Sequence, residues 1–207
     1  MIIYVLISFL TNLMTQADIT FEISSEEKSG SIGINLIRPV SYEMRMLFQG
    51  LGNLIYNFVI IFILAFTLIS LLFYSYEGNL RVGNILLYLL SLSLGFIINF
   101  YYNYAFGLMA FKITNMWGMA QIMSSIVRLL SGGLIPLVFF PKVVQSIIGF
   151  FPFSSLVYTP TMIYLGKLTG EELVRGVALQ VLWVVIMAII AKLIWKALVK
   201  NLTILGG

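Results

Sequence analysis

One uninterrupted apolar run, residues 54–74, constrains this chain more than any other feature. Its sequence, LIYNFVIIFILAFTLISLLFY, contains no acidic or basic residue. Roughly 20 apolar residues suffice to cross the hydrocarbon core of a bilayer as a helix. In water the run would need cover on all sides, and a chain of 207 residues that is 60% hydrophobic and only 10% charged cannot provide it. The sequence therefore predicts an all-α, polytopic transmembrane helical bundle.

Other segments are also apolar enough to cross a bilayer. The further predicted spans are residues 84–108, 116–140 and 177–198. Residues 1–14 are too short to span alone, and no basic residue precedes Lys28, which argues against a signal peptide. We interpret them as part of a spanning helix, within a single transmembrane domain that covers residues 1–207.

The longest polar stretch lies within residues 15–46. It leaves an apolar stripe at helical spacing, formed by Ile19, Ile23, Ile32 and Leu36. Gly30 weakens a helix, and Pro39 favours extended geometry at Arg38. The pattern favours one or two short amphipathic helices at the membrane surface that end at Arg38, with an ordinary interhelical loop as the alternative.

Prolines divide residues 141–160 into short pieces, at Pro141, Pro152 and Pro160. The apolar piece between the first two is too short to cross a bilayer. A short hydrophobic piece between prolines is typical of a re-entrant or interfacial segment.

Basic residues give a weak orientation signal, because cytoplasmic loops carry an excess of them. The side of residues 15–46 holds Lys28, Arg38, Arg45, Lys112, Lys196 and Lys200, and the other side holds Arg81, Lys142, Lys167 and Arg175. The larger group predicts that residues 15–46 and the C-terminus are cytoplasmic.

The residue types that are missing exclude most chemistry. The chain contains no Cys and no His, which removes thiolate and imidazole metal ligands and every Ser–His or Cys–His catalytic pair. Asp18 is the only aspartate, so a pair of intramembrane aspartates is also excluded. The sequence has no GxxxxGK[ST] loop to bind ATP phosphates. We therefore expect no catalytic residues, no metal site, no cofactor and no nucleic-acid partner.

Polar residues inside predicted spans are candidate functional residues. An arginine at the centre of a span costs about 2.5–3.5 kcal/mol, so Arg128 should face protein or water. It either contacts substrate on a translocation path, with Gln121 nearby, or reaches an interface because its helix ends near Ser131. Asn99 and Asn103 are spaced to share a helix face and could line the same path, although such residues more often form interhelical hydrogen bonds.

Short motifs follow one another along most of the chain. They are GSIGINLIRPVS at 30–41, LSGGLIPL at 130–137, FP at 140–141, FPF at 151–153, YTP at 158–160, Gly166, Gln180, Trp183 and Gly206-Gly207. In this order the motifs resemble the ABC-2 type transporter permeases, in particular the group called ABC-2 family transporter protein.

The resemblance implies a permease subunit of an ATP-driven exporter in the plasma membrane. Such a subunit pairs with a second permease protomer and with a separate ABC ATPase subunit, which binds the ATP. A short cytoplasmic helix after the second span docks on the ATPase in this family. The implied coupling residues are Ile19, Ile23, Gly30, Ile32, Leu36, Arg38 and Pro39. Residues 141–160 would match the re-entrant element of the family.

The resemblance also implies a segment that this sequence does not show. Members usually carry a further N-terminal stretch with an interface helix and the first span, whereas this sequence begins within the second. A misassigned start, a truncation or a fragment would each explain the difference. The alternative function is therefore an accessory or non-functional truncated membrane protein without transport. The substrate and the choice between homodimer and heterodimer stay open.

Overall fold

The computed structural model describes residues 2–16, 19–77, 82–113 and 116–199. Every regular element in these ranges is a helix. The prediction of an all-α membrane bundle is thus confirmed. Some residues named in the sequence analysis lie outside the described residues: Asp18, Arg81, Lys200, Gly206 and Gly207.

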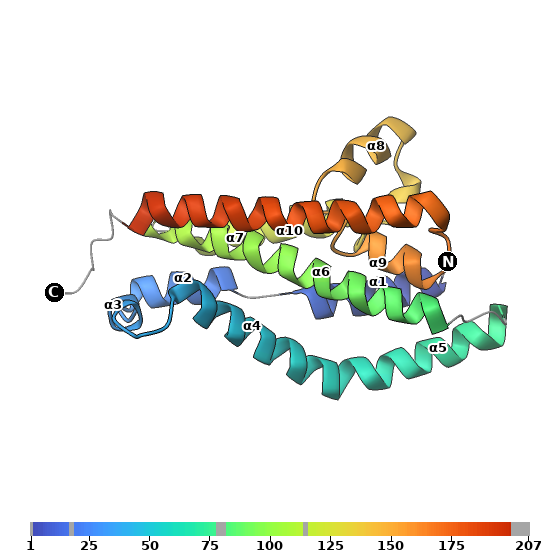
Figure 1. The fold of residues 1–207 in the computed structure, drawn as a ribbon, viewed down its shortest axis with the longest axis horizontal. Helices are drawn as coiled ribbons and strands as arrows, with labels where there is room; N and C mark the ends of the chain where they lie inside the picture. Colours follow the sequence, from blue (N-terminus) through green and yellow to red (C-terminus); the bar gives the residue numbers. More distant parts are fainter. Residues whose placement is uncertain (1, 17–18, 78–81, 114–115, 200–207) are drawn as a thin grey trace.

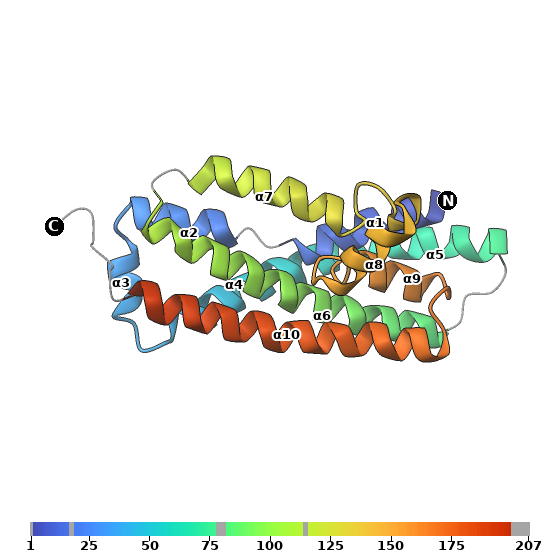
Figure 2. The ribbon, with the colours of Figure 1, turned by 90° about the horizontal axis from the view of Figure 1, so that it is seen from above.

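Long helices form the body of the molecule and run side by side (Figures 1 and 2). Among the described residues, four stretches are long and apolar enough to cross a membrane: Ile2–Lys28, Tyr42–Ser75, Val82–Phe111 and Gly170–Leu198. The first contains α1 (Ile2–Thr15) and α2 (Ile19–Lys28), and the second α4 (Tyr42–Asn57), the π-helical η1 (Phe58–Phe62) and α5 (Ile63–Glu77). The others are α6 (Val82–Gly107) with the 3-10 helix η2 (Leu108–Phe111), and α10 (Gly170–Leu198).

The first stretch is longer than the partial span predicted over residues 1–14, because α2 stays in the bundle. Ile19 and Ile23 are only 2% and 0% exposed, and they pack against α6. The two helices approach closely at Gly107, where a Cβ would lie 2.9 Å from the Cδ1 of Ile23. The apolar stripe exists as predicted, but it faces protein.

A bend divides the second stretch into α4 and α5 (Figure 1). It falls at η1, the π-helical turn, and π-bulges are a known cause of helix kinks. Phe62 stacks on Phe58 and Phe66 of the same stretch and on Tyr88 of α6, so this face of the bend packs into the bundle.

The segment predicted to span over residues 116–140 contains a helix that ends early. Helix α7 (Met116–Leu130) has 15 residues, or about 22 Å of length, against roughly 30 Å of hydrocarbon. It ends because Gly132 adopts a positive φ of 78°, which a side chain would strain. The chain then continues through the short 3-10 helix η3 (Leu137–Phe139).

The proline-rich segment folds into two short helices at one end of the bundle. Helix α8 (Lys142–Phe150) projects from the side of the bundle, and α9 (Tyr158–Tyr164) returns to pack between α1 and α6 (Figure 1). Pro141 is the cap residue of α8, and Pro160 lies in the first turn of α9, where no backbone donor is needed.

The two ends of the bundle carry different elements. The short helix α3 (Ile32–Leu36) joins α2 to α4 at the end where α10 finishes, whereas α8 and α9 lie at the end where α1 begins (Figure 1). We call these the α3 end and the α8–α9 end.

Candidate functional site

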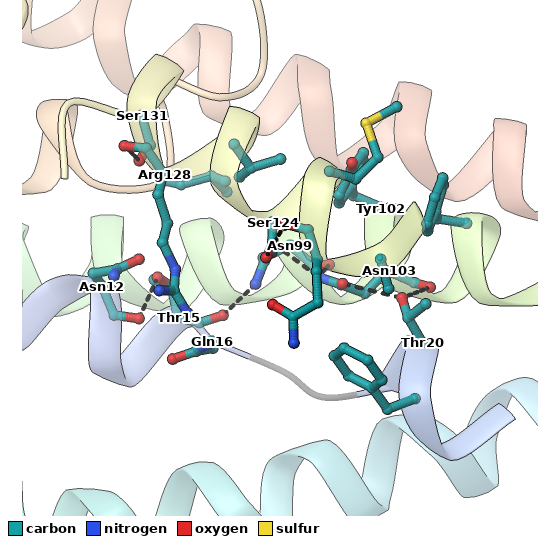
Figure 3. A pocket seen from close by; sticks show the side chains of 17 residues that line it. Asn12, Thr15, Gln16, Thr20, Asn99, Tyr102, Asn103, Ser124, Arg128 and Ser131 are labelled. Atoms are coloured by element: carbon teal, nitrogen blue, oxygen red, sulfur yellow. Dashed lines mark hydrogen bonds between the residues drawn. The ribbon is translucent and has the colours of Figure 1, made fainter. Parts of the chain in front are cut away.

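A polar cavity of about 180 Å³ lies between α1, α2, α6 and α7 (Figure 3). All the residues that the sequence suggested for a translocation path line it: Asn99, Asn103, Gln121 and Arg128. They come from α6 and α7, two helices that the sequence alone could not place beside each other. That they form a translocation path stays a prediction.

Two asparagines of α6 form one side of the cavity and bind the neighbouring helices. The Nδ2 of Asn99 donates to the carbonyl oxygen of Thr15, the last residue of α1, at 2.6 Å. The Nδ2 of Asn103 donates to the Oδ1 of Asn99 at 3.0 Å, and the hydroxyl of Thr20 in α2 donates to the Oδ1 of Asn103 at 3.2 Å. Because carbonyls at a helix end lack helical partners, Asn99 satisfies one where α1 stops.

Helix α7 turns its polar face toward this cavity. Gln121, Ser124 and Arg128 recur at spacings of three and four residues, which places them on one side of a helix. Exposed apolar residues occupy the other side, including Ile122, at 64% exposure, and Ile126. A helix with polar residues inward and apolar residues outward is typical of a membrane protein, in which lipid replaces water outside.

The side chain of Arg128 reaches across the cavity toward Asn12, Thr15 and Gln16 (Figure 3). The helix does end near Ser131, as the interfacial alternative requires, and a cation in the last turn complements the helix dipole. The guanidinium nevertheless points at α1. Within the described ranges, the ion pair found is that of Arg45 with Glu26, far along α2.

Sequence reasoning missed the contribution of the first span to this cavity. Asn12, Thr15, Gln16 and Thr20 supply its wall opposite α7. The signal was present, because Asn12 and Gln16 lie four residues apart in an otherwise apolar region. Asn12 was overlooked because it lies near the end of residues 1–14, which were interpreted only as part of a span.

The predicted coupling residues separate into a buried and an exposed group. Ile32 is only 1% exposed and belongs to the core together with Ile19 and Ile23, so none of these three can contact a partner without unpacking. Leu36 is partly buried against the same core. The residues that point outward around the short helix are Ile34, Ile37, Arg38, Pro39 and Val40. Gly30, with a positive φ of 72°, turns the chain from α2 into α3.

A cluster of side chains closes the base of this exposed loop, and we call it the clamp: Glu26, Tyr42, Arg45, Tyr104 and Trp195. The Nη2 of Arg45 lies 2.5 Å and 2.6 Å from the two carboxylate oxygens of Glu26. The hydroxyl of Tyr42 donates to the same carboxylate at 2.9 Å, and the Tyr42 ring stacks on Trp195 with centroids 5.4 Å apart. Tyr104 lies beside both rings. The clamp thus joins α2, α4, α6 and α10.

Donors from the long helices hold the irregular backbone of the α8–α9 end. Gln180 of α10, fully buried, donates to the carbonyl oxygen of Ser155 at 2.7 Å and accepts from the hydroxyl of Ser91 at 2.8 Å. Trp183 donates to the carbonyl oxygen of Phe150 at 2.9 Å. Both residues belong to the recognised motifs, and the structure gives them a common role. Pro152 lies in the turn between the two anchored carbonyls.

Comparison with known proteins places this architecture in a family. The family model described as ABC-2 family transporter protein matches residues 1–206. The chain therefore belongs to the ABC-2 transporter family, as the motifs indicated, and is a membrane permease subunit of that general kind. No curated protein and no solved structure matches the chain.

Proposed function

We propose that this chain is the permease subunit of an ABC-2 exporter and that the loop around α3 transmits the motion of a separate ATPase. The observation that carries the proposal is the exposed apolar tip of this loop. Ile37 is 83% exposed, Ile34 63% and Val40 51%, next to the charge of Arg38. Apolar residues at the end of a bundle, beyond its long apolar helices, are typical of a protein interface.

The clamp supports a mechanical role for this tip. It ties the end of α2 to the start of α4, so the connecting loop cannot move without moving both helices. Tyr42 also contacts Trp195, which extends the connection to α10. A partner that pushes on Ile37 would therefore displace helices that reach the polar cavity.

The side of the membrane follows from the charges. The α3 end carries Lys28, Arg38, Arg45, Lys112 and Lys196, and the α8–α9 end carries Lys142, Lys167 and Arg175. The excess of cations among the described residues of the α3 end supports a cytoplasmic position for α3 and for the end of α10. In this orientation the partner binds ATP on the cytoplasmic side. The plasma membrane and outward transport are proposed from the family.

A second permease protomer would complete the polar cavity. Gln121 and Arg128 remain exposed in the isolated chain although they lie among apolar helices. Within a membrane such residues must face protein or water. A second protomer that covered the open side of the cavity would provide the protein contact.

The test is co-purification of the tagged chain from detergent-solubilised membranes, followed by mass spectrometry. We expect an ABC ATPase at near-equal stoichiometry, and we expect Ile37→Glu to abolish its recovery. The matched control is Val143→Glu on α8, an equally exposed apolar residue (71%) at the other end, which should keep the ATPase.

Two results would contradict the proposal. A folded wild-type chain that recovers no ATPase would favour an accessory membrane protein. Equal loss with Ile37→Glu and Val143→Glu would show that the α3 tip has no special role. For direction, ATP-dependent accumulation in inside-out vesicles is expected, and accumulation only in right-side-out vesicles would rule out export.

A further inference from the structure

We propose that the polar cavity binds the anionic group of the transported molecule, a phosphate or a carboxylate carried by an amphiphile. This inference rests on the permease function proposed above and names the substrate class of the same site. It is carried by the charge of the cavity, its hydrogen-bond donors and its size.

The described lining of the cavity is cationic. Among the described residues that line it, Arg128 is the charged one and none is acidic. A guanidinium presents several N–H donors in one plane, which match the oxygens of an anion. Near a protein surface the attraction between opposite charges is a few times stronger than in bulk water. An anion that entered the cavity would therefore gain most from contact with Arg128.

The amides around Arg128 offer donors. The carbonyl of Thr15 can only accept, which fixes the Nδ2 of Asn99 toward it, and the Oδ1 atoms of Asn99 and Asn103 accept from Asn103 and Thr20. The second hydrogen on the Nδ2 of Asn99 is then left for a ligand. Gln121 on α7 also lines the cavity and adds an amide. Several N–H groups beside a guanidinium suit the oxygens of a phosphate or carboxylate.

The part of the cavity that one chain forms has the size of a head group and not of a whole drug-sized molecule. A volume of 180 Å³ corresponds to about six water molecules, at roughly 30 Å³ each. Sites for drug-sized ligands measure about 300–1,000 Å³. Phe21, Tyr102, Phe106 and Met123 line the same cavity beside the polar residues, so an apolar tail can leave along them. The ligand is thus an amphiphile with an anionic head.

One acidic residue of the chain must be tested as a competitor. Asp18 lies in the sequence between Gln16 and Thr20, both of which line the cavity, and is outside the described residues. If its carboxylate formed an ion pair with Arg128, the charge of Arg128 would already be balanced and the cavity would not attract an external anion. The variant Asp18→Asn distinguishes these cases.

The experiment is calorimetric titration of dodecyl phosphate into the full chain in phosphatidylcholine nanodiscs, with empty nanodiscs subtracted. We expect saturable binding to the wild type, and affinity about tenfold or more weaker with Arg128→Gln, because a charged hydrogen bond is lost. Arg128→Lys keeps the charge and should retain most of the affinity. Arg175→Gln, which removes an exposed arginine of α10, should bind as the wild type does.

Several outcomes would overturn the inference. These are unchanged affinity with Arg128→Gln, equal binding of dodecyltrimethylammonium, or binding that appears only with Asp18→Asn. If inorganic phosphate bound as tightly as dodecyl phosphate, the apolar tail would contribute nothing to affinity. The ligand would then be a small soluble anion and not an amphiphile. If Arg128→Gln failed to fold, Gln121→Leu would replace it, with a smaller loss expected from the missing donor.

Recovery of the ATPase with the wild-type chain is measured independently of anion binding, so that the two proposals can fail separately. Anion binding without an ATPase would contradict the proposed function, whereas an ATPase partner without anion binding would contradict only this inference.

Discussion

The two ends of the molecule are stabilised in different ways. At the α3 end, the clamp shares one carboxylate among several partners: Glu26 binds both Arg45 and Tyr42, and Tyr42 in turn stacks on Trp195. At the α8–α9 end, side chains of α10 hold individual backbone carbonyls: Gln180 holds that of Ser155 and also bonds Ser91, and Trp183 holds that of Phe150.

The difference reflects what each end must satisfy. Regular helices meet at the α3 end, so their side chains can form a shared network. The α8–α9 end contains irregular backbone, whose carbonyls need donors wherever lipid or protein excludes water. In a shared network, the losses of unfolding free energy caused by two mutations should not add up, because the mutated residues interact. For independent bonds the two losses should be additive.

The largest effect is expected from Glu26→Leu. It leaves the guanidinium of Arg45, with only 19% of its side chain exposed, without its anion, and it removes the acceptor of Tyr42. We expect a loss of about 3 kcal/mol in the free energy of unfolding, measured by denaturant titration in mild detergent. The control is Glu27→Leu, one residue along the same helix.

Cooperativity of the clamp is tested by the double variant Glu26→Leu with Arg45→Leu. Because the second substitution removes the orphaned charge, the double variant should be less destabilised than the sum of the two single variants by at least about 1 kcal/mol. If the double variant lost as much unfolding free energy as the two single variants together, the clamp would not be a cooperative network, and the two ends would not differ in this respect.

The next largest effect is expected from Gln180→Leu at the α8–α9 end. The substitution keeps the volume of a fully buried side chain but removes its bonds to Ser91 and Ser155. Leaving buried polar groups unpaired costs about 1–3 kcal/mol, and we expect a loss of about 2 kcal/mol in the free energy of unfolding. Gln145→Leu is the control, because Gln145 bonds only to carbonyls next to its own helix. Equal losses in the two variants would show that Gln180 is not an anchor between helices.

The sequence predicted the fold class and the polar residues of the site for a simple physical reason. In an apolar span a residue such as Arg128 or Asn99 is conspicuous, because lipid gives it no partner. The end of α7 was also visible, in the Ser131-Gly132-Gly133 break that Gly132 now explains by its positive φ.

The sequence could not show what each helix face contacts. Periodicity correctly grouped Ile19 with Ile23 on one side of a helix, but it could not tell a face buried against α6 from one that meets a partner. The same limit hid the roles of Gln180 and Trp183. The partners of Gln180 lie 25 and 89 residues away in the chain, and that of Trp183 lies 33 residues away. Arg38 and Pro39 of the exposed tip were among the predicted coupling residues, but Ile34, Ile37 and Val40 were missed because α3, with five residues, is too short to display a stripe.

A smaller effect is expected from Trp183→Phe. The substitution keeps an aromatic ring against Phe150 but removes the indole donor to its carbonyl oxygen. One lost hydrogen bond at a partly exposed position should lower the free energy of unfolding by about 1 kcal/mol. A matched change on the same helix is Trp195→Phe, which should disturb the clamp instead and weaken recovery of the ATPase. Loss of ATPase recovery with Trp183→Phe would show that the two ends are mechanically linked.

The smallest effect is expected from Tyr4→Phe. Combined with Trp183→Phe, this variant tests whether the bonds at the α8–α9 end are independent of one another. The hydroxyl of Tyr4 donates to the carbonyl oxygen of Gly132 at 3.2 Å, a long bond, and we expect its removal to lower the free energy of unfolding by about 0.5 kcal/mol. Tyr4 and Trp183 share no partner, so the double variant with Trp183→Phe should equal the sum of the singles within about 0.5 kcal/mol. Additivity here and cooperativity at the clamp, measured by the same titration, would show that the α3 end moves as one unit while the α8–α9 end is held bond by bond. A coupling above that limit would mean that the turn after α7 and the segment from α8 to α9 form a network as well.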